Sequence, residues 1–379
     1  MPTVQASDLR HRPVWAEIDL DAVRSNIGKL RAVVAPSAVL AVVKADAYGH
    51  GAVPVARAVV EAGAAWLGVA LVEEGVTLRA AGIDAPILVL SEPTADAAPT
   101  VVAYGLTPVV YSDPVIDALA AAVRATKAAP LAVHVKIDTG MHRVGAAPDE
   151  LARLAAHLQR EPALAVGGVL THLAVADEPD RPETAAQLAT FAAALASLPP
   201  EVPRGLVHVA NSAGALTSPA ARFDLVRPGI AVYGIPPAAG IGEDIGLRPA
   251  LSLKAQVSCV QDRAAGDRIS YGLRYALPRA GRVATIPVGY ADGVPRALGA
   301  NGGEALVHGR RVPIAGTITM DQLMLDAGDL PVVPGDEVVL LGAQGDQEIT
   351  ATEWARRIGT IPYEIVTSIG PRVPRRYLG

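Results

Sequence analysis

The chain has 379 residues, which is more than one ordinary domain needs and enough for two. Hydrophobic residues make up 51% and aromatic residues only 4%, so the core must be built mainly from aliphatic side chains. The formal net charge of −5 and the lack of a long basic run argue against a protein that binds nucleic acid or another polyanion.

The first thirteen residues are polar, and no uncharged apolar stretch reaches the roughly eighteen residues that a membrane span needs. We therefore expect a cytoplasmic protein without a membrane segment. Cys259 is the only cysteine, which excludes an internal disulfide and a cluster of thiolate metal ligands. Its apolar neighbours predict a buried structural thiol.

In chain order, residues 14–18 predict an extra strand and residues 22–34 a helix. A unit then repeats, in which a short apolar run is followed by a polar turn and an alanine-rich segment of helical period. The eight apolar runs lie at residues 39–43, 66–70, 87–90, 107–110, 131–137, 165–170, 206–210 and 223–226.

Eight βα units of this length predict a closed (β/α)8 barrel, which we place at residues 12–245. The alternative is an open, doubly wound parallel sheet. Such a sheet would need a glycine-rich dinucleotide turn after its first strand, and residues 44–51 are not such a turn.

After residue 245 the helical period gives way to short alternating strands with Gly and Pro turns. Residues 246–379 therefore predict a mainly β domain, to which residues 1–11 are also assigned. The predicted elements are strands at 251–260, 282–288, 304–314, 323–326 and 337–341, a tight hairpin connection at 308–311, and one helix at 350–358.

Polar residues collect at the C-terminal ends of the predicted barrel strands, where barrel enzymes carry their active sites. They are Lys44, Lys136, Asp138, Arg143, His172, Asn211, Ser212 and Arg227. Lys44 ends an apolar run, so it is either a surface lysine with a buried stem or a desolvated amine able to form a Schiff base. Its position alone leaves both open.

The remaining residues of this group also have two interpretations each. Lys136 alternates with His134 and Asp138 on one strand face, so its amine is either paired with an acid or chemically modified. Ser212 either caps a helix or binds a phosphate. Arg227 precedes a Pro-Gly turn and serves either the site or a surface ion pair.

The motifs closely resemble those of the bacterial alanine racemases, in the same order, over about residues 14–371. In the barrel part they are AVVKADAYGHG at 41–51, KIDTGMHR at 136–143, TH at 171–172, NS at 211–212 and VRPGI at 226–230. In the β part they are SYG at 270–272, VGYADG at 288–293 and MDQ at 320–322.

The resemblance implies a pyridoxal-phosphate enzyme in which Lys44 holds the cofactor as an internal aldimine. It assigns the cofactor phosphate to Tyr48, Ser212, Tyr363 and the backbone of Gly229 and Ile230, with Asn211 nearby. It places His172 against the pyridine ring, Arg227 at the ring nitrogen and Arg143 at the phenolic oxygen and the substrate carboxylate. It also implies that Lys136 is carbamylated and pairs with Arg143.

The implied reaction is the racemisation of alanine by two bases, Lys44 and Tyr271, which supplies D-alanine for peptidoglycan. Tyr271 and Met320 would come from the β domain of a second subunit, so the active unit would be a homodimer, and Tyr290 would also contact the substrate. No metal is implied. The alternatives are a racemase of another small or basic amino acid, a barrel-type decarboxylase, and a non-catalytic carrier of the cofactor.

Two features bear on these alternatives. A carrier is typically a barrel alone, whereas this chain has a β domain with Tyr271. A decarboxylase uses a cysteine near its site, whereas Cys259, the only cysteine, lies in an apolar strand.

The chain also departs from the family pattern. His142 stands where glycine is common, and Thr317 and Thr319 stand where Arg and Cys are frequent. These departures concern the access of substrate to the site.

Overall fold

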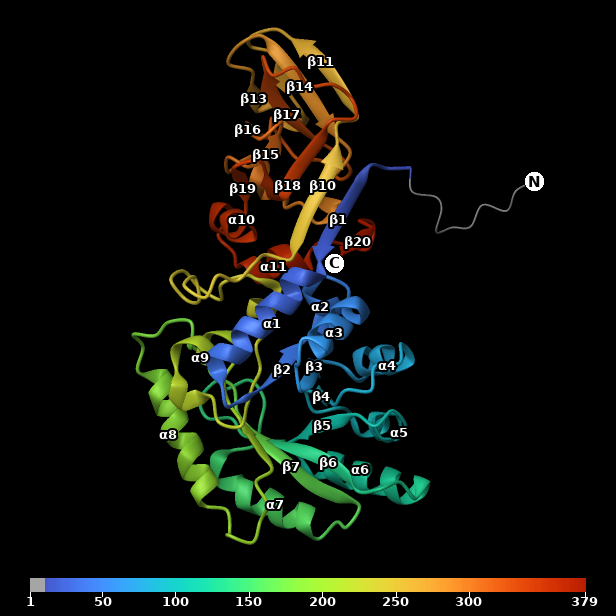
Figure 1. Cartoon of the computed structure of the whole chain (residues 1–379), viewed down its shortest axis with the longest axis vertical. Helices are drawn as coiled ribbons and strands as arrows, with labels where there is room; N and C mark the ends of the chain where they lie inside the picture. The colour runs from blue at the N-terminus through green and yellow to red at the C-terminus, as the bar shows by residue number, and fades with distance from the viewer. Residues whose placement is uncertain (1–10) are drawn as a thin grey trace, which may run out of the picture. The chain divides into compact units, whose positions relative to one another are not determined.

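The computed structural model describes residues 11–379 and divides the chain into two compact units (Figure 1). The barrel unit is Asp21–Arg248, and the β unit is Pro249–Gly379 together with the described residues up to Leu20. The assignment of residues 1–10 to the β domain lies outside the described residues. Within residues 11–379, no helix has both the length and the apolar character needed to cross a membrane.

The barrel unit contains one sheet of eight parallel strands in the order β8-β7-β6-β5-β4-β3-β2-β9. The strands are β2 (Ala38–Val42), β3 (Trp66–Val69), β4 (Ile87–Val89), β5 (Thr107–Val110), β6 (Leu131–Lys136), β7 (Leu164–Leu170), β8 (Leu206–His208) and β9 (Leu225–Val226). Two backbone hydrogen bonds, from Asp224 N to Val207 O at 3.0 Å and from Arg227 N to Ala210 O at 2.9 Å, join the sheet's first and last strands. The prediction of a barrel is confirmed.

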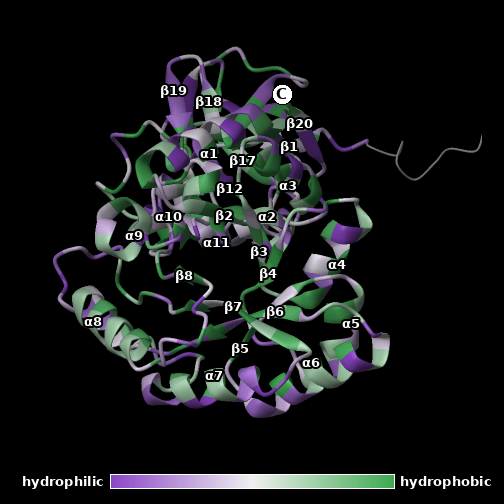
Figure 2. Cartoon of the chain, turned by 60° about the horizontal axis from the view of Figure 1, so that its bottom comes forward, coloured by the Kyte–Doolittle hydropathy of each residue, from purple (hydrophilic) through white to green (hydrophobic). Residues whose placement is uncertain are grey.

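Helices lie around the outside of these strands (Figure 1). They are α1 (Leu20–Val34), α3 (Ala52–Glu61), α4 (Val72–Ala80), α5 (Ala98–Ala103), α6 (Asp113–Thr126), α7 (Leu151–Gln159), α8 (Glu183–Ala196) and the short α9 (Ser212–Thr217). In α7 the buried residues are Leu151, Leu154, Ala155 and Leu158, which form one apolar stripe. The barrel strands are mostly hydrophobic, whereas the helices carry hydrophilic segments on their outer side (Figure 2).

The β unit is built on a sheet whose main path runs β16-β15-β18-β10-β1-β20, with β19 paired to β18. These strands are β1 (Val14–Asp19), β10 (Leu251–Gln256), β15 (Glu304–Val307), β16 (Arg310–Pro313), β18 (Glu337–Gln344), β19 (Gln347–Ile349) and β20 (Arg375–Leu378). The smaller sheets use β11 (Cys259–Arg263), β12 (Arg268–Ile269), β13 (Tyr275–Ala276), β14 (Gly281–Ile286) and β17 (Leu323–Gly328). The unit also contains the α-helices α10 (Ala351–Ile358) and α11 (Pro362–Thr367).

The structure places the boundary between the units differently from the predicted boundary at residue 12. Strand β1 pairs antiparallel with β10, with Val14 opposite Ala255, and parallel with β20. Residues 14–19 therefore belong to the β unit, because their hydrogen-bonding partners lie there. At the other end the barrel unit extends to Arg248, three residues beyond the predicted end.

Two further expectations about the β unit are wrong. Residues 251–260 form two strands in different sheets, β10 and β11, rather than one strand. Cys259 is exposed rather than buried. The reason is that β11 is an edge strand of the sheet β11-β14-β17 and most of its residues face solvent. The hairpin at 308–311 does form, between β15 and β16, and His308 in its turn has φ 50°.

Candidate active site

The predicted polar group of the barrel unit lies at one end of the barrel, because all eight strands are parallel. Lys44 follows β2, Lys136 ends β6, and His172 follows β7. Asn211 and Ser212 come after β8, and Arg227 comes directly after β9. This is the end at which barrel enzymes carry their reacting groups.

The two lysines of this group have lowered pKa values. Burial lowers the pKa of Lys44, and the nearby positive charge of Arg143 adds to this, whereas the negative charge of Glu74 opposes it. Burial, followed by the charges of Arg227 and Arg143, lowers the pKa of Lys136 to about 8. A larger share of each amine is therefore neutral near pH 7 than in an exposed lysine. Only the neutral amine can attack a carbonyl carbon or carbon dioxide.

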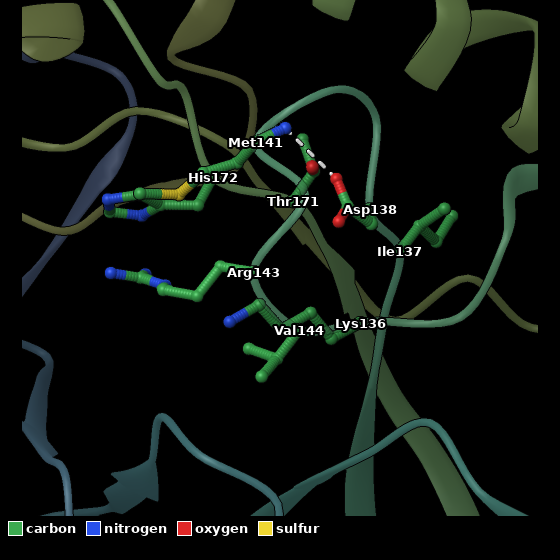
Figure 3. A pocket seen from close by; sticks show the side chains of 8 residues that line it. All are labelled: Lys136, Ile137, Asp138, Met141, Arg143, Val144, Thr171 and His172. Atoms are coloured by element: carbon green, nitrogen blue, oxygen red, sulfur yellow. Dashed lines mark hydrogen bonds between the residues drawn. The ribbon is translucent and has the colours of Figure 1, made fainter.

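Figure 3 shows the side chains of Lys136, Arg143 and His172 pointing to the same side. Asp138, the acid considered as a partner for Lys136, instead turns toward its own loop. Its Oδ1 accepts hydrogen bonds from the backbone N–H groups of Gly140, Met141 and His142 at 2.9–3.0 Å. The side chains at this end of the barrel therefore gather positive charge, which favours an anionic ligand.

Arg227 is a buried residue of the site and not part of a surface ion pair, since it is only 4% exposed. Its guanidinium donates to the carbonyl oxygens of Thr171 at 2.7 Å and Val209 at 2.9 Å. It also donates to Nδ1 of His208 at 2.9 Å and to Nδ1 of His172 at 3.3 Å. The position of the guanidinium is thus fixed by four acceptors.

These contacts also fix the tautomers of the histidines. Nδ1 of His208 accepts from Arg227, so its Nε2–H donates to Nδ1 of His134 at 2.8 Å. Burial first, and then the charge of Arg227, lowers the pKa of His134 to about 4 and those of His172 and His208 well below the usual value. All three rings are therefore neutral at pH 7. Burial lowers the pKa of Arg227 itself to about 10, so it remains the charged member.

A cluster of hydroxyl and backbone N–H groups lies beside β9. Ser212 Oγ accepts from the backbone N of Gly229 at 2.8 Å and from that of Ala231 at 3.4 Å. The cap of α9 is Asn211, whose side chain accepts from Gly214 N at 2.9 Å, so Ser212 is not needed as the cap. A side chain at Gly229 would collide with the hydroxyl of Tyr48, so the backbone closely approaches that phenol. The hydroxyls of Ser212 and Tyr48 lie beside this backbone, and hydroxyls are hydrogen-bond donors that suit a phosphate group.

A second group of predicted residues lies in the β unit. Tyr271, Tyr290 and Met320 line a recess of about 670 Å³ together with Arg296 and residues 317–322. Tyr271 is 73% exposed, and its backbone oxygen accepts a 2.9 Å hydrogen bond from the Thr317 hydroxyl. The recess thus presents an exposed phenol whose backbone is fixed.

Tyr363, the remaining residue assigned to the cofactor phosphate, is half-buried in α11 of the β unit.

Two residues with contacts to the barrel group were not singled out from the sequence, namely His208 and Glu74. His208 ends strand β8, and its position at a strand end is a signal that could have identified it. Glu74 lies in the first turn of α4, where acidic residues are ordinary, so its position carries no comparable signal.

Two family models match the chain. The alanine racemase N-terminal domain matches residues 18–237, and the alanine racemase C-terminal domain matches residues 250–377. The chain belongs to the alanine racemase family. It is 51% identical to an alanine racemase of Symbiobacterium thermophilum over 97% of this chain and 98% of that protein.

Other relatives match over similar shares of their length. An alanine racemase of Thermobifida fusca is 48% identical, over 96% of this chain and 98% of that protein. The crystal structure of alanine racemase from D-cycloserine-producing Streptomyces lavendulae superposes with a TM-score of 0.90 at 44% identity, over 97% of both chains. The family resemblance of the motifs is thereby confirmed for both units.

Proposed function

We propose that this chain interconverts L- and D-alanine with pyridoxal phosphate as cofactor and with Lys44 and Tyr271 as the two bases. Its family membership supports the reaction, and the match to the Symbiobacterium thermophilum alanine racemase covers 98% of that protein. The observation that carries the cofactor assignment is the barrel end itself. A half-buried amine with a lowered pKa lies there with Arg143, Arg227 and the hydroxyl of Ser212.

The residues of the barrel end fit this cofactor. When bound, pyridoxal phosphate withdraws electrons from the α-carbon of an amino acid and so eases loss of its proton. Lys44 would supply the amine that attaches the cofactor, and Arg227, held by four acceptors, would donate to the ring nitrogen. His172 would pack against the ring. The phosphate would be held by Tyr48, Ser212, Tyr363 and the backbone of Gly229 and Ile230, with Asn211 nearby.

Lys136 would be carbamylated. Its pKa of about 8 leaves part of the amine neutral, which is the form that adds to carbon dioxide. Addition forms a bond from the lysine nitrogen to the carbon of CO₂ and releases one proton. The resulting anion would pair with Arg143, which points to the same side (Figure 3). Arg143 would then be oriented to bind the substrate carboxylate.

Racemisation needs a group on each face of the α-carbon, one that removes the proton and one that delivers a proton to the opposite face, with the roles exchanged in the reverse direction. Lys44 would serve one face and the phenol of Tyr271 the other, while Met320 and Tyr290 would contact the substrate. Because Tyr271 stands exposed on the β unit, we propose that it enters the site of a second copy of the chain, so that the active unit is a homodimer. The enzyme would act in the cytoplasm and supply D-alanine for peptidoglycan.

The reaction is tested by incubating the purified protein with L-alanine in heavy water. We expect the optical rotation to fall to zero and the α-proton to exchange with solvent. A non-catalytic carrier would do neither. A racemase of another amino acid would turn over serine or lysine with a higher kcat/KM than alanine, and this result would contradict the substrate assignment.

The shared site is tested by mixing two inactive variants, Lys44→Arg and Tyr271→Phe, under conditions that allow subunits to exchange. Half of the dimers would then be mixed, and each mixed dimer would contain one intact site. The expected recovery is about one quarter of the wild-type activity. If the mixture stays as inactive as its components while mixed dimers are detected by mass, Tyr271 does not act in the partner's site.

A further inference from the structure

A left-handed turn directly follows Lys44. Residues 45–48 all have φ between 52° and 54°, and the turn has an α-type hydrogen bond from Ala47 N to Val43 O at 2.9 Å. None of the four is glycine, and a residue with a Cβ is unfavourable in this conformation because the Cβ crowds the following carbonyl. Four such residues in succession persist only if surrounding contacts hold them.

Glu74 makes such a contact from the first turn of α4. Its Oε2 accepts hydrogen bonds from the backbone N–H groups of Ala70 at 2.7 Å and Leu71 at 3.1 Å, which is an ordinary role for an acid at a helix start. Its Oε1 accepts from the N–H of Ala45 at 2.6 Å, in a different loop. One carboxylate therefore joins the loop after β2 to the loop after β3, and these two strands are neighbours in the barrel.

The far end of the turn is held by other groups. The carboxylate of Asp46 accepts from the backbone N of Ala52, the first residue of α3, at 2.7 Å. The ring of Tyr48 packs on that of Tyr233 with centroids 5.0 Å apart. The contact from Glu74 acts at the opposite end, on the residue that immediately follows Lys44.

We propose that Glu74 is a positioning residue, which clamps the left-handed turn and thereby holds Lys44 and Tyr48 in place for the cofactor. This inference rests on the proposed roles of Lys44 and Tyr48. The competing explanation is that Glu74 acts only through its charge, which opposes the lowering of the Lys44 pKa. The two explanations differ in what they predict for the backbone of residues 44–49.

The first test compares the wild-type holoenzyme with Glu74→Gln and Glu73→Gln. Glutamine has one acceptor oxygen and an amide nitrogen that only donates, so it cannot accept from Ala45 and from the start of α4 together. Glu73 is an exposed acid in the same helical turn, so Glu73→Gln removes the same charge without touching the clamp.

For Glu74→Gln we expect hydrogen exchange of the backbone amides of residues 44–49 to become roughly tenfold faster. We expect kcat to fall about 10- to 100-fold, as for a misplaced reacting group. Glu73→Gln should match the wild type in both. If Glu74→Gln exchanges like the wild type in this segment, the clamp is refuted whatever happens to kcat. Glu74→Asp keeps the charge, but its side chain is too short to reach both loops, so we expect the same effects as for Glu74→Gln. It is the replacement variant for this test if Glu74→Gln does not fold.

The second test is a rescue. Ala45→Gly removes the Cβ from the first left-handed residue, so the turn needs less support. In the double variant Glu74→Gln/Ala45→Gly we expect several-fold recovery of the lost kcat. A purely electrostatic role predicts no recovery, and that result would overturn the proposal. If the wild-type protein itself neither racemises alanine nor exchanges its α-proton, the proposed function fails, while the exchange comparison still tests the clamp.

Discussion

The end of the barrel and the recess of the β unit hold their candidate residues in opposite ways. Arg227 is buried and has four hydrogen-bond acceptors, two of which are rings of neutral histidines. Tyr271 is 73% exposed, and what the structure fixes is its backbone, through the hydroxyl of Thr317. Arg227 is thus part of the buried core of the barrel.

Substitutions in the two regions should therefore have different kinds of effect. A change at the barrel end alters packing, hydrogen bonding and charge together, so it affects both folding and chemistry. A change to an exposed side chain of the recess leaves the fold intact and alters only what that side chain touches during the reaction. The following variants test this contrast, starting with the largest expected effect.

The largest effect is expected for Lys44→Arg. Arginine keeps the positive charge but lacks an amine that can be deprotonated and attach the cofactor. We expect kcat to fall by about 10⁴-fold or more in both directions, and the purified protein to lose the cofactor's absorbance. The matched control is Lys127→Arg, an exposed lysine at the end of α6. If the Lys44→Arg protein still binds the cofactor covalently at another residue, the assignment of Lys44 as the cofactor-bearing lysine is contradicted.

The next largest effect is expected for Tyr271→Phe. Removing the phenol should slow α-proton exchange of one enantiomer of alanine by about 10²- to 10⁴-fold and affect the other much less. The free energy of unfolding should change by less than about 0.5 kcal/mol, because the fold of its own chain leaves the side chain exposed. Tyr104→Phe, an exposed tyrosine of the barrel unit, is the control. An equal loss for both enantiomers would rule out a one-face role for Tyr271.

The third prediction concerns acid stability and the buried histidines. His134 has a pKa of about 4 in the folded protein and about 6.5 when unfolded, so the unfolded chain binds its proton first as the pH falls. Its contribution to stability is therefore present above pH 6.5 and is lost between about pH 6.5 and 4, amounting to about 3 kcal/mol.

His134→Gln tests this, because glutamine keeps an acceptor for the N–H of His208 but cannot be protonated. Between pH 6.5 and 4 its free energy of unfolding should fall by about 3 kcal/mol less than that of the wild type. Denaturant titrations at several pH values measure this slope. The exposed His11→Gln serves as the control. A wild-type slope in His134→Gln would mean that other groups dominate acid unfolding.

Much of the fold could be predicted from the sequence because the signals are local. The predicted strand at 107–110 coincides with β5, and the other barrel strands agree within a few residues. The place of β1 could not be predicted in this way. Its partners, β10 and β20, lie more than 230 residues away in the chain, and nothing in residues 14–19 themselves specifies that pairing.

The same limit applies to individual side chains. The alternation around Cys259 indicates which residues share a face, but it does not indicate whether another layer covers that face. Glu74 has a sufficient local explanation as an acid at a helix start, so its second contact, with Ala45, is visible only in three dimensions. Lys44 and Arg227 were singled out by their positions at strand ends, but each position left two interpretations open, and only the resemblance of their motifs to a family implied a role.

The smallest effect is expected at His142, where the family pattern commonly has glycine. His142 has φ 54°, and its backbone N–H donates to Asp138 at 3.0 Å. Replacing it with glycine removes the Cβ that disfavours this conformation, which is worth about 1 kcal/mol, but adds freedom to the unfolded chain. We expect His142→Gly to raise the free energy of unfolding by about 0.5 kcal/mol. His142→Ala, which keeps the Cβ, should give no gain. If the alanine variant is the more stable of the two, the backbone at this position is not strained, and the histidine is tolerated because the loop held by Asp138 adapts to it.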